Sequence, residues 1–213
     1  MTSESPEAKT HNHRKWPKSL LIGFVFIAVA CAVYIRTHPL VFNESLLEHA
    51  HCIAQVGLGL NQYALDHFGK FPAHTNGYGD ALLLMLAEGY ESSYALSGPG
   101  YDRFVFDRAL TNHTDVPEIE CGRVYVQGLS ATSNPELVLL FDKLPTPGGD
   151  HCHLLKRLWA PLGREIWIVG DGHKFIKETA WPEFARNQVE LLVKEGFSRT
   201  NAEALYSEKG RVR

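Results

Sequence analysis

The feature that most constrains this chain is an uncharged, mostly apolar run near its N-terminus, from Leu20 to Ile35. At about 1.5 Å per helical residue this run reaches roughly 24 Å, somewhat less than a hydrocarbon core of about 30 Å. The flanking Lys18 and Arg36 can extend to the lipid headgroups and make up the difference. The run therefore predicts a transmembrane signal anchor over residues 19–36.

Charge predicts the orientation of this anchor. The segment 1–18 carries an excess of basic residues close to the membrane edge, namely Lys9, Arg14, Lys15 and Lys18. Positively charged flanks stay in the cytoplasm. We therefore expect a cytoplasmic tail over residues 1–18, a single span in a bacterial inner membrane, and a periplasmic main domain.

Two other interpretations of the apolar run stay open. Ala28-Val29-Ala30 has the small-x-small pattern of a signal-peptide cleavage site, and Cys31 could be the acylated residue of a lipoprotein. Residues 32–35 continue the apolar run beyond either cleavage point, which favours an uncleaved anchor.

The rest of the chain has the composition of a globular, acidic protein. The whole sequence is 45% hydrophobic and 21% charged, which is ordinary for a folded domain. Residues 38–213 carry 16 Lys and Arg against 22 Asp and Glu, a net charge of −6. This balance argues against a nucleic-acid partner, since such proteins carry basic surfaces.

The cysteines fit an exported domain. Cys121 and Cys152 lie in loop-like sequence, where an oxidising compartment would allow a disulfide between them. Two alternatives remain open: both are reduced and buried, or Cys52 pairs with one of them.

A long amphipathic helix is predicted after the apolar run. Residues at helical spacing form one stripe, made of Leu46, Ala50, Ile53, Gly57, Leu60, Ala64 and His67. Four further apolar residues widen it: Leu47, Ala54, Leu58 and Leu65. Gly69 and Pro72 should end the helix. Gly57 and Gly59 indicate close approach of another backbone, which we expect to be the sheet that follows.

Shorter elements come next. We expect a short helix over 80–86 with Asp80 as its N-cap, then a loop over 91–118 that contains one strand at 103–107. Strands are predicted at 123–128, 136–142, 164–169 and 174–177, with a turn at Asp171-Gly172-His173 between the last two. Helices follow, one from Pro182 to Gly196 and a short one capped by Thr200.

The sequence thus predicts an α+β fold in four parts. After the cytoplasmic tail and the N-terminal transmembrane helix, residues 37–180 form a domain in which a long amphipathic helix packs on a small antiparallel sheet. Residues 181–213 form a C-terminal helical extension.

Several segments in this order resemble type IV pilins and type II secretion pseudopilins. The stretch 52–72 is similar to the pseudopilin helix and its Gly-x-Tyr-Pro end, 81–90 to their second segment, and 125–143 to their first strand pair. Residues 164–173 resemble the C-terminal strand and Asp-Gly-His turn of prepilin-type proteins with an H-x9-DG segment. The resemblance covers roughly residues 20–180. It implies a pilin-like fold and a structural or protein-interaction role, with pilin-like or secretion components as partners and no cofactor.

The sequence departs from the pilin pattern at two points. Ala28 stands where a processed pilin has the Glu of its fifth mature position, so the prepilin peptidase motif is not clear. Pro161 stands where the H-x9-DG segment has its His, while His151 and His153 lie further back.

A second hypothesis is a metal site. Asp150, His151 and His153 lie close in sequence, and Asp171 and His173 could approach them across a hairpin. Imidazoles and carboxylates are ligands for zinc and similar ions. The alternative function is therefore a periplasmic metal-binding protein or metal-dependent enzyme. Calcium would instead need oxygen ligands, and the sequence offers Asp142, Asp150 and Asp171.

No catalytic motif is present in the sequence. It contains no nucleophile elbow, P-loop, zinc-protease signature or paired catalytic carboxylates. We therefore expect a membrane-anchored interaction protein rather than an enzyme.

Overall fold

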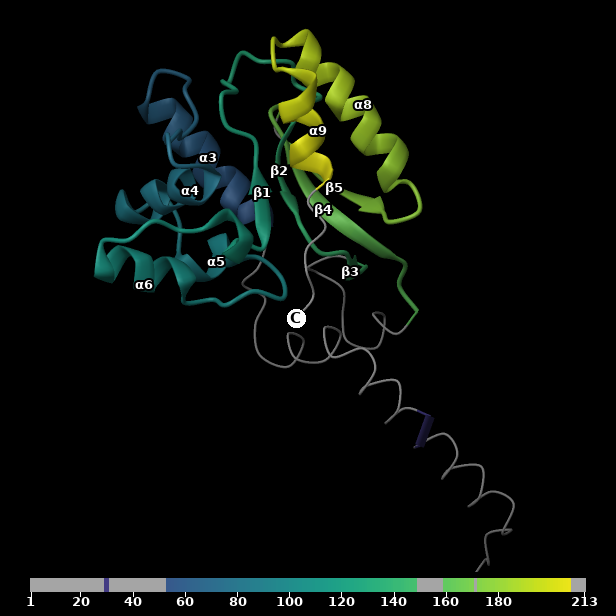
Figure 1. The fold of residues 1–213 in the computed structure, drawn as a ribbon, viewed down its shortest axis with the longest axis horizontal. Helices are drawn as coiled ribbons and strands as arrows, with labels where there is room; N and C mark the ends of the chain where they lie inside the picture. The colour runs from purple at the N-terminus through teal and green to yellow at the C-terminus, as the bar shows by residue number, and fades with distance from the viewer. Residues whose placement is uncertain (1–28, 31–52, 149–158, 171, 208–213) are drawn as a thin grey trace, which may run out of the picture. The chain divides into compact units, whose positions relative to one another are not determined.

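A computed structural model of the chain describes residues 29–30, 53–148, 159–170 and 172–207 (Figure 1). The chain divides into two compact units, residues 1–39 and 40–213. Of the first unit only Val29 and Ala30 are described, and both are helical.

The predicted transmembrane anchor needs correction. Within the described ranges, no helix is both long enough and apolar enough to cross a membrane. A span needs about 20 consecutive apolar residues in a helix. Of the expected segment 19–36 the structure describes only Val29 and Ala30, and the remainder, like the tail at 1–18, lies outside the described residues. The transmembrane part of the predicted fold class, the signal anchor and the single-pass inner-membrane location are therefore withdrawn.

The second unit is α+β, with helices around a small antiparallel sheet. Its helices are α3 (Ile53–Asp66), α4 (Tyr78–Ala87), α5 (Ser93–Ser97), α6 (Val105–Asn112), the 3-10 turn η1 (Glu118–Glu120), α8 (Trp181–Lys194) and α9 (Arg199–Ser207). Its strands are β1 (Arg123–Tyr125), β2 (Val138–Asp142), β3 (Thr146–Pro147), β4 (Leu162–Ile168) and β5 (Gly172–Lys177).

All strand pairs in the sheet are antiparallel. β2 lies between β1 and β4, and β4 pairs in addition with β3 and β5. Val124 pairs with Phe141, and Phe141 pairs with Ile166. Every residue of β2 is buried, because helices cover both of its faces. Figure 1 shows α3 to α6 on one side of the sheet and α8 and α9 on the other.

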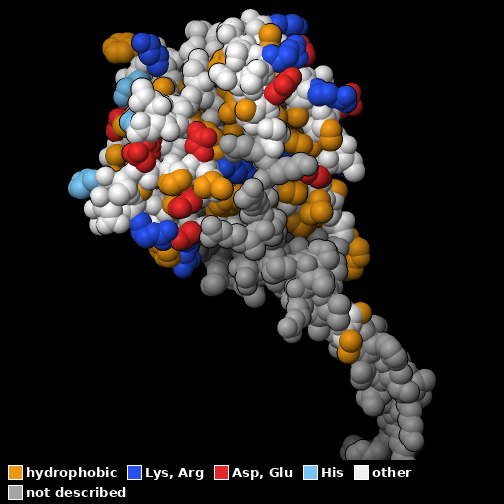
Figure 2. All heavy atoms as spheres, in the orientation of Figure 1, with side chains coloured by type: hydrophobic (Ala, Val, Ile, Leu, Met, Phe, Trp, Pro, Cys, Tyr) orange, Lys and Arg blue, Asp and Glu red, His pale blue; other side chains and the backbone are white. Residues whose placement is uncertain are grey.

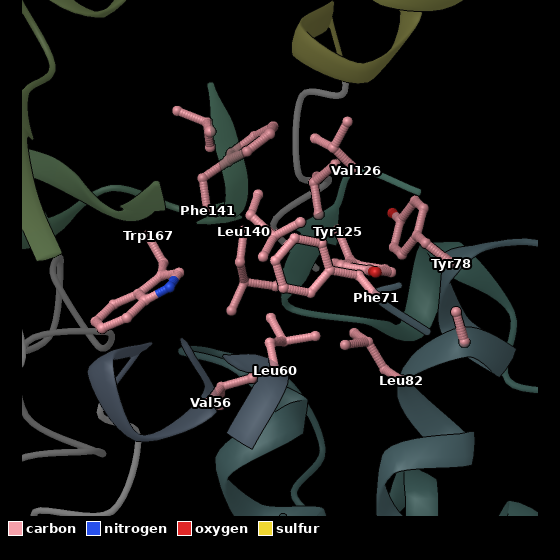
Figure 3. Packing of buried hydrophobic residues seen from close by; sticks show 14 of the residues in the cluster. Val56, Leu60, Phe71, Tyr78, Leu82, Tyr125, Val126, Leu140, Phe141 and Trp167 are labelled. Carbon is pink, nitrogen blue, oxygen red and sulfur yellow. The ribbon is translucent and has the colours of Figure 1, made fainter. Parts of the chain in front are cut away.

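Helix α3 packs its inner face on the sheet. Ile53, Gly57, Leu60 and Ala64 are buried, as the stripe predicted. Val56 and Leu60 lie beside Leu140, Tyr125 and Trp167 in the core (Figure 3). The N-terminal half of the predicted long helix, residues 46–52, lies outside the described residues.

Two predictions about α3 are wrong in detail. Leu58 and Leu65, expected to widen the buried stripe, are exposed, because the stripe that meets the sheet is narrower than the apolar pattern. Gly57 faces the indole ring of Trp167 rather than a backbone. Gly59 does approach a backbone, since a Cβ there would lie 2.9 Å from the Tyr90 carbonyl oxygen, but that residue follows α4 and is not in the sheet.

The segment 91–118 is not a loop with a strand. It forms α5 and α6, and the expected strand at 103–107 is the start of α6. Ser92 caps α5 by accepting a hydrogen bond from the Ala95 amide at 3.3 Å. Asp80 is not an N-cap either, because α4 begins at Tyr78; the Asp80 carboxylate accepts from the Val116 amide at 2.7 Å. The polar side chains that led to the loop prediction therefore cap short helices or bind the segments that connect them.

The C-terminal half of the chain follows the predicted order with shifted ends. β1, β2, β4 and β5 lie at the four predicted strand positions, and β3 is an additional short strand. Gly172 and His173 belong to β5 rather than to the turn, while Asp171 lies outside the described residues. α9 begins at Arg199, and Ser198, not Thr200, accepts the capping hydrogen bond from Asn201.

Helices α8 and α9 complete the core on the second face of the sheet. The Phe141 ring stacks on Tyr206 with 5.1 Å between centroids, and Trp181 lies 5.2 Å from the same ring. Gln188 accepts a hydrogen bond from the Val138 amide and donates one to the Glu136 carbonyl. This side chain ties α8 to the start of β2.

Candidate functional site

Of the five predicted metal ligands, the structure describes one. His173 lies on β5 opposite Trp167, and its Nε2 is 2.8 Å from Oε2 of Glu165 on β4. Asp150, His151, His153 and Asp171 lie outside the described residues. No group of three or more His, Cys, Asp or Glu placed to hold a metal ion occurs in the part of the chain that the structure describes.

His173 belongs to a row of charged side chains that crosses the sheet. The Glu165 carboxylate is buried, with a side chain 3% exposed against 30% for His173. Because Phe141 pairs with Ile166, the next residues Asp142 and Glu165 lie side by side on one face. Asp142 Oδ1 accepts a hydrogen bond from Arg123 Nε at 3.1 Å, and both of these side chains are fully buried.

This row has two carboxylates and two basic groups. Arg123 also donates to the Ala95 carbonyl of α5, which fixes its guanidinium. The hydrogen bond to Glu165 raises the pKa of His173, against partial desolvation, and the negative charges of Glu165 and Asp142 add to the rise. The protonated imidazolium then balances the second carboxylate. Such a row can hold a proton on His173, and Nε2 is occupied by Glu165 rather than open to a metal ion.

His173 and Asp142 were candidate ligands in the sequence, but their partners Glu165 and Arg123 were not predicted from it. Arg123 and Glu165 lie in strands made largely of buried residues, and a charge inside a buried strand requires a partner. That mismatch was the available signal. The disulfide prediction stays open, since Cys152 lies outside the described residues; Cys121 is buried, with its Sγ 3.7 Å from the Pro117 carbonyl oxygen.

A second candidate functional site consists of exposed apolar side chains. Figure 2 shows hydrophobic side chains scattered among charged ones over the face in view, which is ordinary for a protein surface. The exposed leucines on α3 differ from the scattered ones because they recur at a regular spacing. Leu58 is 59% exposed and Leu65, two turns later, 76%. Gln55 and Gln62 are exposed at the intermediate positions.

We call Gln55, Leu58, Gln62 and Leu65 the outer row of α3. Their spacings of three, four and three residues are those of a coiled-coil seam, with Leu at one seam position and Gln at the other. Gln55 donates to Glu91 at 2.9 Å and Gln62 to Asp66 at 3.1 Å, so both amides are held in place. The outer row is thus an uncharged strip opposite the face that packs on the sheet.

A strained residue lies just beyond α3. Phe68 is two residues past the end of the helix, is 98% exposed and has a backbone φ of 56°. A left-handed backbone at a bulky residue is unfavourable, and exposure of the whole ring adds to the cost.

No protein-family model, curated protein or solved structure matches the chain.

Proposed function

We propose that this protein is a pilin-like interaction component that packs on a second copy of itself through the outer row of α3. The observation that carries the proposal is the exposure of Leu58 and Leu65 at seam spacing on a helix whose opposite face is buried. The resemblance of residues 52–72 and 164–173 to pseudopilins supports the same kind of role.

Physical considerations favour a second copy as the occupant. None of the four side chains of the outer row is charged, and the carboxylates of Glu91 and Asp66 beside it are hydrogen-bonded to Gln55 and Gln62. Burying a Leu side chain contributes about 1.5–3 kcal/mol, so two pairs of leucines give a sizeable driving force.

The polar positions supply orientation. Polar residues at a seam position lower the stability of a helix pair but fix its register. Gln55 and Gln62 are seven residues apart, so a shift by three or four residues would set them against Leu58 or Leu65. The outer row therefore encodes one preferred alignment of the two helices.

A photo-crosslinking experiment tests the proposal. The full chain is prepared with p-benzoylphenylalanine in place of Leu58, or in place of Ile119, which is 67% exposed on η1. We expect a covalent dimer from position 58 only, and loss of that dimer when Leu65→Glu is added. A dimer of equal yield from position 119, or capture of a different protein alone at position 58, contradicts self-association through the outer row.

A further inference from the structure

A pocket of about 420 Å³ lies where β1 meets α4 and α9. Its walls include Tyr78, Glu118, Tyr125, Gln127, Phe197 and Asn201. Pockets that bury small organic ligands have volumes of about 300–1,000 Å³, apolar walls and a few fixed polar groups. The size and composition of this pocket fit that description.

The aromatic walls are held rigidly. Tyr125 is buried, and its hydroxyl donates to the Pro72 carbonyl at 2.7 Å. The Tyr78 hydroxyl donates to the Glu118 carbonyl at 3.3 Å. Both tyrosines are also almost fully buried, so they form the fixed floor of the pocket. A ligand therefore pays little entropy for ordering these two rings.

The described residues that line the pocket include one negatively charged side chain and no positively charged one. Among the described residues that line it, Glu118 alone is charged. Glu118 Oε1 accepts from the Tyr78 amide at 3.0 Å, at the start of α4, whereas its Oε2 takes part in no hydrogen bond within the described ranges. Gln127 accepts the His74 amide through Oε1, which leaves its amide group to donate.

We propose that this pocket binds an organic ammonium ligand, with its apolar body against the half-buried Phe197 and Leu205 and its charged nitrogen on Glu118 Oε2. A hydrogen bond between ammonium and carboxylate is about twice as strong as a neutral one. An anionic ligand would instead meet the Glu118 charge. The site is independent of the outer row of α3, since no residue is common to both.

A nearby side chain shows that these surroundings accept an ammonium group. The Nζ of Lys143 lies 5.4 Å from the centroid of the Tyr78 ring and donates to the Glu118 carbonyl. Ammonium groups within about 6 Å of an aromatic ring are attracted to its face. Lys143 is not among the residues that line the pocket, so the pocket itself stays available to a ligand.

Titration of the full chain with three probes of one size tests the proposal. Benzylamine, benzyl alcohol and benzoate are added at millimolar concentration while the side-chain amide signals of Gln127 and Asn201 are followed by NMR. We expect saturable shifts with benzylamine, binding about tenfold weaker with benzyl alcohol, and none with benzoate.

Three variants identify the site. Glu118→Gln keeps an oxygen for the Tyr78 amide but removes the charge, and should reduce benzylamine binding to the level of the alcohol. Ala204→Phe, at an exposed position of the wall, should block both probes by filling the pocket. Glu120→Gln is the matched control and should bind like the wild type.

Each contrary result overturns the assignment. Binding of the alcohol as tight as that of the amine, or unchanged amine binding in Glu118→Gln, shows that charge is not recognised. Persistent binding in Ala204→Phe places the ligand elsewhere. Absence of saturable shifts with every probe shows that the pocket is not a ligand site of this class.

Discussion

Gly57 of α3 lies against the indole ring of Trp167 on β4, so closely that a Cβ atom at Gly57 would overlap the ring. This contact sets the distance between the helix and the sheet. Trp167 pairs with Leu140 in the sheet register, so the same contact fixes which strand positions face α3.

Gly57→Ala should therefore lower the free energy of unfolding by about 2–3 kcal/mol, the cost of overpacking a core. The expected sign opposes helix propensity, which favours Ala over Gly by about 1 kcal/mol. Urea unfolding of the full chain measures the difference. Gln62→Ala, at an exposed position of the same helix, is the control and should be nearly neutral. A Gly57→Ala protein as stable as the wild type would mean that α3 shifts freely on the sheet.

The buried ion pair of Arg123 and Asp142 should be costly to break. Asp142→Asn removes the charge of the carboxylate that accepts from Arg123 Nε in the core, which costs about 3–5 kcal/mol. The exposed pair of Arg108 and Asp102 provides the comparison, with 2.7 Å between its charged atoms. Asp102→Asn should remove less than about 1 kcal/mol by weakening this pair. Equal losses at both sites in denaturant unfolding would contradict the burial argument.

The pair of His173 and Glu165 should make stability depend on pH. The folded-state pKa of His173 is raised by Glu165, so the imidazolium stabilises the fold fully below the unfolded-state value of about 6.5. That contribution is lost as the pH rises through the raised pKa. We expect a loss of at most about 1 kcal/mol, because the His173 ring is partly exposed.

Melting temperatures measured from pH 5.5 to 8.5 test this dependence. His173→Gln should flatten the curve in the range where the wild type loses stability. His113→Asn is the control, since His113 caps α6 in a left-handed conformation that Asn accepts. A curve that keeps its slope in His173→Gln assigns the pH dependence to other groups.

Gln188 should be required for its two hydrogen bonds rather than for its size. Gln188→Leu leaves the Val138 amide and the Glu136 carbonyl without that partner, and should cost about 1–3 kcal/mol. Gln188→Glu keeps an acceptor for the Val138 amide, but its ionised carboxylate would be buried and would face the Glu136 carbonyl oxygen, so we expect a loss at least as large as for Gln188→Leu. Leu191→Met on the same helix is the control. A neutral Gln188→Leu would show that β2 is anchored without α8.

The sequence by itself determined the elements with strong local signals. The burial of Ile53, Leu60 and Ala64 followed from helical spacing, and β2 and β4 from runs of Val, Ile and Leu. These patterns are local because a helix repeats every 3.6 residues and a strand every two. The predicted membrane span also rested on a local pattern, and no described helix supports it.

Only the tertiary structure decided which apolar and charged residues lie inside. Leu58 and Leu65 read as core in the pattern but are exposed, because the sheet covers a narrower strip of α3 than the pattern marks. Arg123, Asp142 and Glu165 are buried because residues 19 or more apart in sequence pair across the strands. A charged side chain carries no local signal of its partner, since the partner is brought to it by strand register alone.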